Sequence, residues 1–455
     1  MKKETNEFCT RIKRKLGKMA YFSIFSIPML LLRIRQQISY EESTTIAKFF
    51  VSAARYQKQY LQALKVFFLL FFKVSWRDFS PDYSLFSKRQ YKAENNAWSI
   101  GRWYSIKPEE TKKLGMRLDS QNMKYFSIGR EAIVHILRCN EFAKKIVLLP
   151  NFTCFTVLDP FIQEGWKICF YRYNKDLSID SDYFLEVFNK EKPSICVFQP
   201  LSGMGFLEAE KNLIEFAHKK ECMTIVDQTQ DIYNHRNDPF VDYYCASLRK
   251  WYPFPDGAFL YSEKRRIEQF EEHKKNNIYQ TSMGLCMFAA HLRSIYDDLY
   301  FDYLHNFMWT FSVSYIGNTN IVPHTMSDYS RQVLLGQNEE DNTKRRVDNF
   351  NYIYRGIEHL EKVKPAFATI ERLTCVPLSF PVYVDNRQKF STFLAQNGIV
   401  TQLLWGKPPY IKKYVDLDET TEYIYSHIIS LPCDQRYDLE DMKRMVNVIC
   451  AYEQC

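Results

Sequence analysis

Residues 194–231, SICVFQPLSGMGFLEAEKNLIEFAHKKECMTIVDQTQD, decide the fold of this chain. They begin with a short apolar run, Ile195–Gln199, continue through an amphipathic stretch, Lys211–His218, and end in a second apolar run, Met223–Val226. Short apolar runs that alternate with helical stretches are typical of βαβ units, which build a mostly parallel sheet. The segment therefore predicts an α/β domain.

The same alternation continues on both sides of this segment, beginning at about Phe126. It predicts a helix over Arg130–Leu137 and further strands at Ile146–Leu149, Ile168–Tyr171 and Ala258–Tyr261. A chain of 455 residues is longer than one hydrophobic core usually serves, so we expect several lobes. We predict a basic, apolar helical extension (1–90), a large α/β cofactor domain with its entry segment (91–325), and connecting helices with a small C-terminal α/β domain (326–455).

The composition excludes several classes of protein. Mean hydropathy is −0.36 and no apolar run approaches about 20 residues, so a polytopic membrane protein is not expected. The 12 cysteines form no CxxC pair, and His and Cys show no zinc-ligand spacing. These patterns predict reduced thiols in the cytoplasm and no structural metal.

The net charge of +8 comes from the N-terminal segment alone. The first 75 residues hold 14 basic and four acidic side chains, which leaves 47 basic and 49 acidic ones for the rest. The segment also carries two apolar runs, Ala20–Leu32 and Val66–Phe72, each too short to span a bilayer about 30 Å thick. No small-residue cleavage pattern follows the first run, so a signal peptide is not predicted.

Three interpretations of residues 1–90 stay open. The helices pack against the main body, or they lie at the inner face of an anionic membrane, where each basic residue adds about 1 kcal/mol. The third interpretation, nucleic-acid binding, is the weakest, because no recognised nucleic-acid module follows the basic segment. We therefore predict a cytoplasmic protein with no nucleic-acid partner, for which peripheral membrane contact through residues 1–90 is one alternative.

Polar residues follow two of the predicted strands and precede the last one. Asp227-Gln228-Thr229-Gln230 ends one strand, Asn151–Phe155 follows another, and Ser247-Leu248-Arg249-Lys250 precedes the strand at Ala258. Ligands of such sheets bind beyond the carboxyl ends of the strands. A fourth group, Ser127–Glu131, opens the first helix, where exposed N–H groups and a glycine favour phosphate binding.

Together these groups indicate one chemistry. A lysine on a loop forms a Schiff base when its amine is deprotonated, and a carboxylate at a strand end holds a heterocyclic nitrogen protonated. Pyridoxal 5′-phosphate (PLP) requires both groups. Lys250 and Asp227 are therefore the candidate catalytic pair.

The residues resemble a known family in the order of their blocks. The blocks are VLLPNFTCFTVLDPF (147–161), residues 194–231, CASLRKWYPFPDGAFLYS (245–262), HTMSDYSRQVLLGQN (324–338), FSTFLAQNGIVTQLLWGKPP (390–409) and ISLPCDQRYDLEDMKRM (429–445). This order is similar to that of the DegT/DnrJ/StrS family of PLP-dependent nucleotide-sugar aminotransferases, which have fold type I. The resemblance spans about Phe126 to Val448.

The resemblance implies a role for individual residues. Lys250 matches the Schiff-base lysine, Asp227 the partner of the pyridine nitrogen, and Gln230 the side chain that hydrogen-bonds the cofactor's 3-hydroxyl. The positions that match the family's phosphate site are Ser127, Gly129, Arg130 and Ser247. Lys250 also argues against the related sugar dehydratases, which have histidine there.

Two positions depart from the family pattern. Cys154 stands where the family has an aromatic residue that stacks on the pyridine ring, so Phe152 and Phe155 are candidates to replace it. Thr325 stands near the position where the family has an Asn that reaches the phosphate of the neighbouring subunit. The sequence therefore predicts the fold more firmly than it predicts the affinity for the cofactor.

The resemblance implies an aminotransferase. It predicts amino transfer from glutamate or glutamine to a keto sugar on a nucleotide carrier, in surface-polysaccharide or related glycan biosynthesis, by a homodimer with shared active sites. Two alternatives stay open. One is another fold type I PLP enzyme, which catalyses elimination or acts on an amino acid, and the other is a catalytically idle relative that serves as a membrane-associated scaffold.

Overall fold

The computed structural model describes the chain mainly from residue 120 onward. The described residues are 74–75, 80–81, 100–101, 120–233, 236–268, 279–280, 283–284, 286–287, 290, 305, 309, 312, 320–367, 376–401, 405 and 417–454. The predicted extension, residues 1–90, thus lies outside the described residues, except for the paired strands β1 (Val74–Ser75) and β2 (Ser80–Pro81).

The chain divides into two compact units. The first comprises residues 1–92, 105–108 and 277–318, and contains the β1–β2 pair. The second comprises residues 93–104, 109–276 and 319–455, and contains both larger sheets. The division at residue 325 that the sequence suggests stays a prediction.

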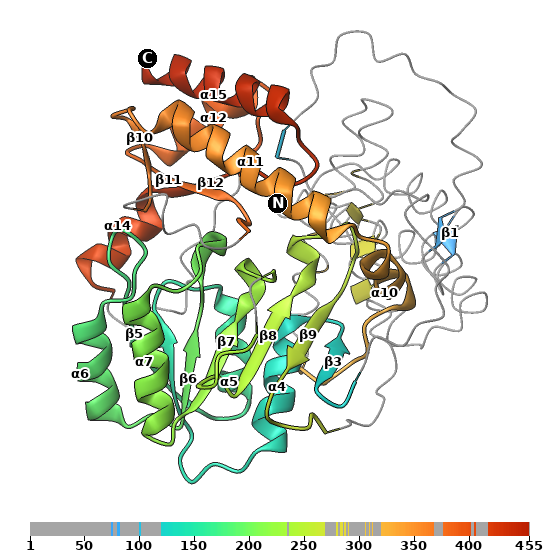
Figure 1. Ribbon diagram of the computed structural model, residues 1–455, viewed down its shortest axis with the longest axis vertical. Coiled ribbons are helices and arrows are strands. Elements are labelled where there is room, and N and C mark those ends of the chain that lie inside the picture. The colour runs from blue at the N-terminus through green and yellow to red at the C-terminus, as the bar shows by residue number, and fades with distance from the viewer. Residues whose placement is uncertain are drawn as a thin grey trace, which may run out of the picture. The chain divides into compact units, whose positions relative to one another are not determined.

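A seven-stranded sheet forms the centre of the second unit (Figure 1). Its strands run in the order β3-β9-β8-β7-β6-β4-β5, and the five from β8 to β5 are parallel. β9 runs antiparallel to both of its neighbours, β8 and β3. The strands are β3 (Met123–Phe126), β4 (Ile146–Pro150), β5 (Lys167–Tyr171), β6 (Ile195–Phe198), β7 (Met223–Asp227), β8 (Tyr243–Ser247) and β9 (Ala258–Tyr261).

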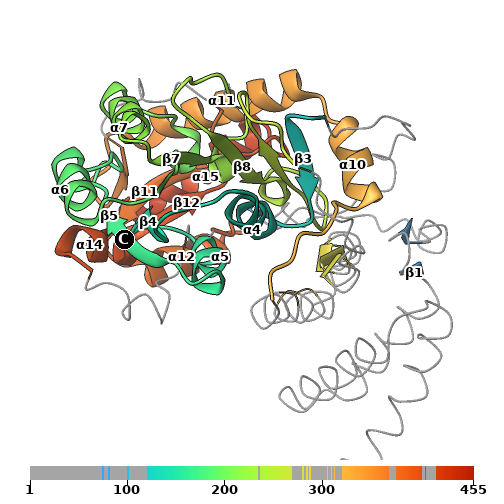
Figure 2. The ribbon, with the colours of Figure 1, turned by 90° about the horizontal axis from the view of Figure 1, so that it is seen from below.

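Helices cover both faces of this sheet (Figure 2). α4 (Gly129–Cys139) and α5 (Leu158–Gln163) pack against one face through one buried apolar cluster. α6 (Ser181–Glu191) and α7 (Glu208–Lys219) pack against the other face through a second cluster. Buried strands with helices on both faces explain the continuous apolar runs in the sequence.

A three-stranded antiparallel sheet forms the small C-terminal lobe. Its strands are β10 (Val363–Pro365), β11 (Phe380–Val384) and β12 (Ile428–Leu431). From residue 328 to the C-terminus, the described α-helices are α10 (Asp328–Leu335), α11 (Glu339–Ile357), α12 (Arg387–Gln396), α14 (Glu419–His427) and α15 (Leu439–Glu453). The large sheet and this lobe confirm the predicted fold class.

The five predicted strands of the large sheet are confirmed to within a residue or two, and two further strands of that sheet, β3 and β8, were not predicted. β8 lies between β7 and β9 in the sheet, and β3 lies at its edge. β8 is preceded by Asp242, which interrupts its apolar run, and that carboxylate accepts hydrogen bonds from the Thr224 N–H and from Arg265. The sequence pattern therefore did not predict β8, because the buried Asp242 breaks the apolar run at its start.

Neither a membrane span nor a metal cluster is found among the described residues. None of their helices is long and apolar enough to cross a membrane. Nor do three or more of their His, Cys, Asp and Glu side chains come together as a group that could hold a metal ion.

Candidate active site

The site lies at the carboxyl ends of neighbouring strands of the large sheet. The order β8-β7-β6-β4 places Ser247, Asp227, Gln199 and Thr153 at or just beyond four adjacent strand ends. Parallel strands bring such residues to one edge of a sheet, where ligands of this architecture bind. The topology therefore brings together three of the polar groups that the sequence singled out.

Asp227, the last residue of β7, is buried and held by two neutral donors. Its Oδ1 accepts the Thr229 N–H at 2.9 Å, and its Oδ2 accepts the Gln199 Nε2–H at 2.8 Å. One donor on each oxygen holds the carboxyl group in a single orientation. Asp227 is therefore fixed in orientation and suited to hold a protonated ring nitrogen.

Lys250 ends the short 3₁₀ turn Leu248–Lys250, directly after β8. Burial lowers the pKa of its amine, and the positive charge of Arg249 acts in the same direction. Cys154 and Asp227 oppose this shift, so both lie close enough to Lys250 to influence its charge. A lowered pKa increases the neutral fraction of the amine, which is the nucleophilic form.

Three predicted anion-binding residues come together at the start of α4. Gly129 faces Ser247, because a Cβ built on Gly129 would lie 3.5 Å from the Ser247 Cβ. The Ser127 carbonyl accepts the Gly257 N–H at 2.6 Å, which ties this helix start to the loop after Lys250. The Ser127 hydroxyl is buried and has no hydrogen-bond partner among the described residues.

Arg130, predicted at the same anion site, directs its guanidinium elsewhere. Its Nη1 lies 2.5 Å from Asp159 Oδ2, and its side chain is 8% exposed. This ion pair connects α4 to α5. The part of Arg130 that we expect at the anion site is therefore its main-chain N–H.

Glu131 holds the helix start together, a role that the sequence analysis missed. Its Oε2 accepts the N–H groups of Ser127 and His324 at 3.1 Å each, and its Oε1 lies 2.9 Å from the His324 Nδ1. Burial raises the pKa of this carboxyl group, although His324 acts to lower it. A partner 193 residues away along the chain leaves no local signal in the sequence.

Gln230 has one satisfied and one unsatisfied end. Its Oε1 accepts the Ser202 N–H at 2.6 Å, whereas its buried Nε2 finds no partner in the described part of the chain. Ser202 takes up a left-handed backbone conformation, with φ of 54°, which is uncommon for a residue with a side chain. The amide is thus held by its oxygen, and its donor end stays available.

The residues near Cys154 separate into different roles. Phe152 is fully buried and packs edge-on against Trp405 and Tyr425, with ring centroids 5.0 and 4.8 Å away. Phe155 is 37% exposed, whereas Cys154 is half-buried and its Sγ contacts the Thr156 hydroxyl at 3.1 Å. Phe152 therefore belongs to the core, whereas Cys154 lies close enough to Lys250 to influence its charge.

Thr325 lies beside the first strand of the sheet. It forms an antiparallel bridge with Phe126, and the carbonyl of its neighbour His324 accepts the Ser127 N–H at 2.9 Å. The segment around Thr325 therefore lies next to the helix start of its own chain. The expected contact of this position with the phosphate of a neighbouring subunit stays a prediction.

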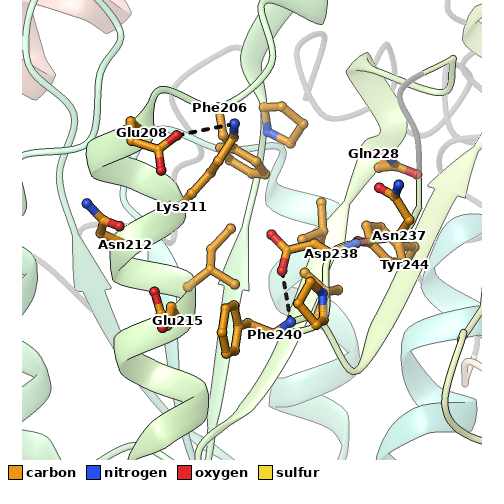
Figure 3. Close-up of a pocket in the computed structure, with 15 residues that line it drawn as sticks. Phe206, Glu208, Lys211, Asn212, Glu215, Gln228, Asn237, Asp238, Phe240 and Tyr244 are labelled. Atoms are coloured by element: carbon orange, nitrogen blue, oxygen red, sulfur yellow. Dashed lines mark hydrogen bonds and ion pairs between the residues drawn. The ribbon is translucent and has the colours of Figure 1, made fainter.

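A separate hollow opens between α7 and the loop that leads into β8 (Figure 3). Its volume is about 540 Å³, and Lys211, Glu215, Asp238 and Phe240 are among the residues that line it. Gln228 also lines it, but Lys250, Gln230 and Ser247 do not. The hollow is therefore distinct from the group of residues around Asp227.

The family becomes recognisable from the C-terminal part of the chain. Residues 326–450 match the model of the DegT/DnrJ/EryC1/StrS aminotransferase family. The match confirms the predicted resemblance over these residues. Among curated proteins, none is significantly similar to this chain in sequence.

Solved structures with the same fold include several aminotransferases. Spr1654 from Streptococcus pneumoniae, in its PLP form, is 14% identical, with 77% of this chain and 93% of that chain covered and a TM-score of 0.54. NtdA from Bacillus subtilis, with bound PMP, is 14% identical, covers 73% of each chain and has a TM-score of 0.53. The sugar aminotransferase CalS13 from Micromonospora echinospora is 14% identical, with 72% and 87% covered and a TM-score of 0.52. At this identity the likeness shows the fold.

The residues present fit PLP. The unpartnered Gln230 Nε2 and Ser127 Oγ are buried polar groups that a bound ligand would satisfy, and buried groups of this kind rarely stay without partners. Lys250 could hold the aldehyde carbon, Asp227 the ring nitrogen, and the start of α4 with Ser247 the phosphate. PLP supplies an electron sink for reactions at the carbon that carries the amino group.

Proposed function

We propose that this chain transfers an amino group from an amino-acid donor, glutamate or glutamine, to a keto sugar carried on a nucleotide. The setting is surface-polysaccharide or related glycan biosynthesis in the cytoplasm, and the working assembly is a homodimer. The observation that carries the proposal is the placement of two groups at adjacent strand ends: Lys250, a half-buried lysine whose amine has a lowered pKa, follows β8, and Asp227 ends β7.

Each group has a defined task in this reaction. Lys250 would hold the aldehyde carbon of the cofactor, and its free amine would carry a proton to or from the substrate carbon. Asp227 would keep the ring nitrogen protonated, and the Gln230 Nε2 would donate to the 3-hydroxyl oxygen. Ser127, Ser247 and the N-terminus of α4 would hold the phosphate.

The choice of a sugar acceptor rests on the family. The matched family is one of aminotransferases, and CalS13, the relative from Micromonospora echinospora, is a sugar aminotransferase. The two alternatives, an enzyme for another PLP reaction and an idle scaffold, differ in measurable ways. An idle relative would leave PLP unbound, whereas an enzyme of another specificity would bind it and reject sugars.

The test is nitrogen transfer with a defined acceptor panel. The PLP-loaded protein is incubated with glutamate or glutamine labelled with ¹⁵N at the α-amino group and a panel of keto nucleotide sugars, and the products are analysed by mass spectrometry. We expect one ¹⁵N atom in a sugar product, and none with the Lys250→Ala variant. Nitrogen transfer to simple keto acids but to none of the sugars would contradict the proposal.

A further inference from the structure

We propose that Gln199 is the positioning residue of Asp227, and that Thr153 holds the Gln199 amide in place by donating to its oxygen. The inference rests on the proposed function, in which Asp227 is the partner of the cofactor's ring nitrogen. The resemblance to the family gives no role to Gln199 or Thr153. The roles proposed here follow from hydrogen bonds at the carboxyl ends of the strands.

The contacts form a continuous chain of buried groups. The Thr153 hydroxyl donates to Gln199 Oε1 at 2.7 Å, and Gln199 Nε2 donates to Asp227 Oδ2 at 2.8 Å. Thr153 is fully buried, and Gln199 is 5% exposed. Water therefore has little access to either bond, and in such surroundings hydrogen bonds are electrostatically stronger than in water.

Thr153 completes the orientation of the Gln199 amide that faces its NH₂ group to Asp227. A carboxylate only accepts, and an amide turned by 180° would place its carbonyl oxygen against Asp227, where two acceptors repel each other. With the NH₂ group on Asp227, the amide oxygen faces Thr153, whose hydroxyl donates to it. Without the hydroxyl, the oxygen of Gln199 would lose its buried donor.

This row of hydrogen bonds continues to the C-terminal lobe. The Thr153 N–H donates to the hydroxyl of Tyr425, on α14, at 3.3 Å. The same hydroxyl donates to the Asn151 carbonyl at 3.0 Å. The loop after β4 is thereby held against the small lobe. The position of Asp227 is consequently linked to that lobe through Gln199 and Thr153.

The consequence concerns the charge of the ring nitrogen. Asp227 has two donors, Gln199 on one oxygen and the Thr229 N–H on the other, and together they hold the carboxylate in one orientation. A carboxylate fixed toward a ring nitrogen would hold that nitrogen protonated. Removal of the Gln199 donor would leave one oxygen unsatisfied and free to turn.

The experiment compares two pairs of variants in the full-length protein. Gln199→Leu removes the donor, and Thr153→Val removes the hydroxyl but keeps the size of the side chain, whereas Thr153→Ser retains the hydroxyl. Gln163→Leu is the matched control, because its amide, at the C-terminal end of α5, also bridges two backbone groups, those of Ile321. Two quantities are measured: PLP affinity, and the ¹⁵N chemical shift of ring-labelled PLP, which reports nitrogen protonation. Thermal unfolding of the cofactor-free variants verifies their folding.

We expect Gln199→Leu and Thr153→Val to weaken PLP binding about tenfold or more, since a hydrogen bond to a charged group contributes about 1.5 to 3 kcal/mol. The nitrogen shift should move toward the unprotonated value. Thr153→Ser and Gln163→Leu should match the wild type. If the wild type binds PLP with a protonated nitrogen and both variants are unchanged, the inference is wrong. If the wild type binds no PLP, the proposed function fails, and the inference with it.

Discussion

Gly129, the first residue of α4, faces Ser247, the last residue of β8, with 3.5 Å between a Cβ built on the glycine and the serine Cβ. A helix N-terminus and a hydroxyl are thus side by side at the predicted phosphate position. Gly129 has no positive φ, so a larger residue there fills space without backbone strain. Its effect on an anion can therefore be separated from an effect on folding.

The first prediction concerns this contact. Ser247→Ala removes one hydroxyl donor and should weaken PLP binding about five- to tenfold, because a single hydrogen bond contributes about 1 kcal/mol and more when the acceptor is charged. Gly129→Val should weaken it further by filling the space in front of Ser247. Fluorescence titration of the cofactor-free protein measures both effects.

Ser194→Ala is the control for this prediction. The Ser194 hydroxyl donates to the Lys144 carbonyl just before β6, at the opposite edge of the sheet. Its loss should leave PLP affinity unchanged. Equal affinities for wild type, Ser247→Ala and Gly129→Val would show that the phosphate lies elsewhere.

The second prediction follows from the lowered pKa of Lys250. Between that pKa and the value of 10.5 for a free lysine, the unfolded chain binds more protons than the folded one. The stability of the cofactor-free wild type should therefore rise with pH in this range. Lys250→Met removes the buried amine, so it should be more stable than the wild type at pH 7.

Urea unfolding at several pH values between 7 and 10.5 measures this difference. The advantage of Lys250→Met should shrink as the pH rises. Lys443→Met, a change at an exposed lysine on α15, should show no such trend. A constant difference across this pH range would mean that Lys250 titrates like a solvated lysine.

The third prediction tests the role of Glu131. Glu131→Ala leaves the His324 N–H without its carboxylate acceptor, whereas the Ser127 N–H keeps the His324 carbonyl as an acceptor. A donor that loses its partner costs about 1 to 3 kcal/mol when buried, so we expect a loss of about 1 to 3 kcal/mol in the free energy of unfolding. Chemical denaturation of the cofactor-free protein measures the loss.

Glu164→Ala provides the comparison. Glu164 pairs with the exposed Arg138 at 2.8 Å, and exposed pairs of this kind contribute at most about 1 kcal/mol. A similar, small loss for both glutamate variants would contradict a structural role of Glu131 at the start of α4.

The fourth prediction uses Cys154 as a probe of the cofactor position. Its thiol is half-buried and close to Lys250, whereas Phe152 is committed to the core. Bound PLP should slow the alkylation of Cys154 by iodoacetamide at least several-fold. Cys450, also half-buried but on α15, should react at the same rate with and without PLP. Peptide mass spectrometry follows each site.

Periodicity in the sequence predicted most of the large sheet, because its strands are buried on both faces. It missed β8, since Asp242 interrupts the apolar pattern and only the fold shows that Thr224 and Arg265 satisfy this acid. The positions of Asp227 and Lys250 followed from the rule that ligands bind at the carboxyl ends of strands. The same rule could have identified Gln199, which directly follows β6.

Contacts between distant segments were beyond the reach of the sequence. The resemblance left Phe152 and Phe155 as equal candidates for the ring position, and only the packing of Phe152 against the small lobe separates them. The pairing of Glu131 with His324 likewise depends on where residues 320–326 return to the sheet. Such pairs have no local periodicity or spacing from which they could be predicted.

Covalent trapping tests the central claim most directly. The purified protein is incubated with PLP and reduced with borohydride, and its peptides are sequenced by mass spectrometry. We predict a yellow protein before reduction and a single pyridoxyl group on Lys250 afterwards, which the Lys250→Ala variant lacks. A colourless protein that takes up no PLP, or a pyridoxyl group on another lysine, would contradict the assignment of this site.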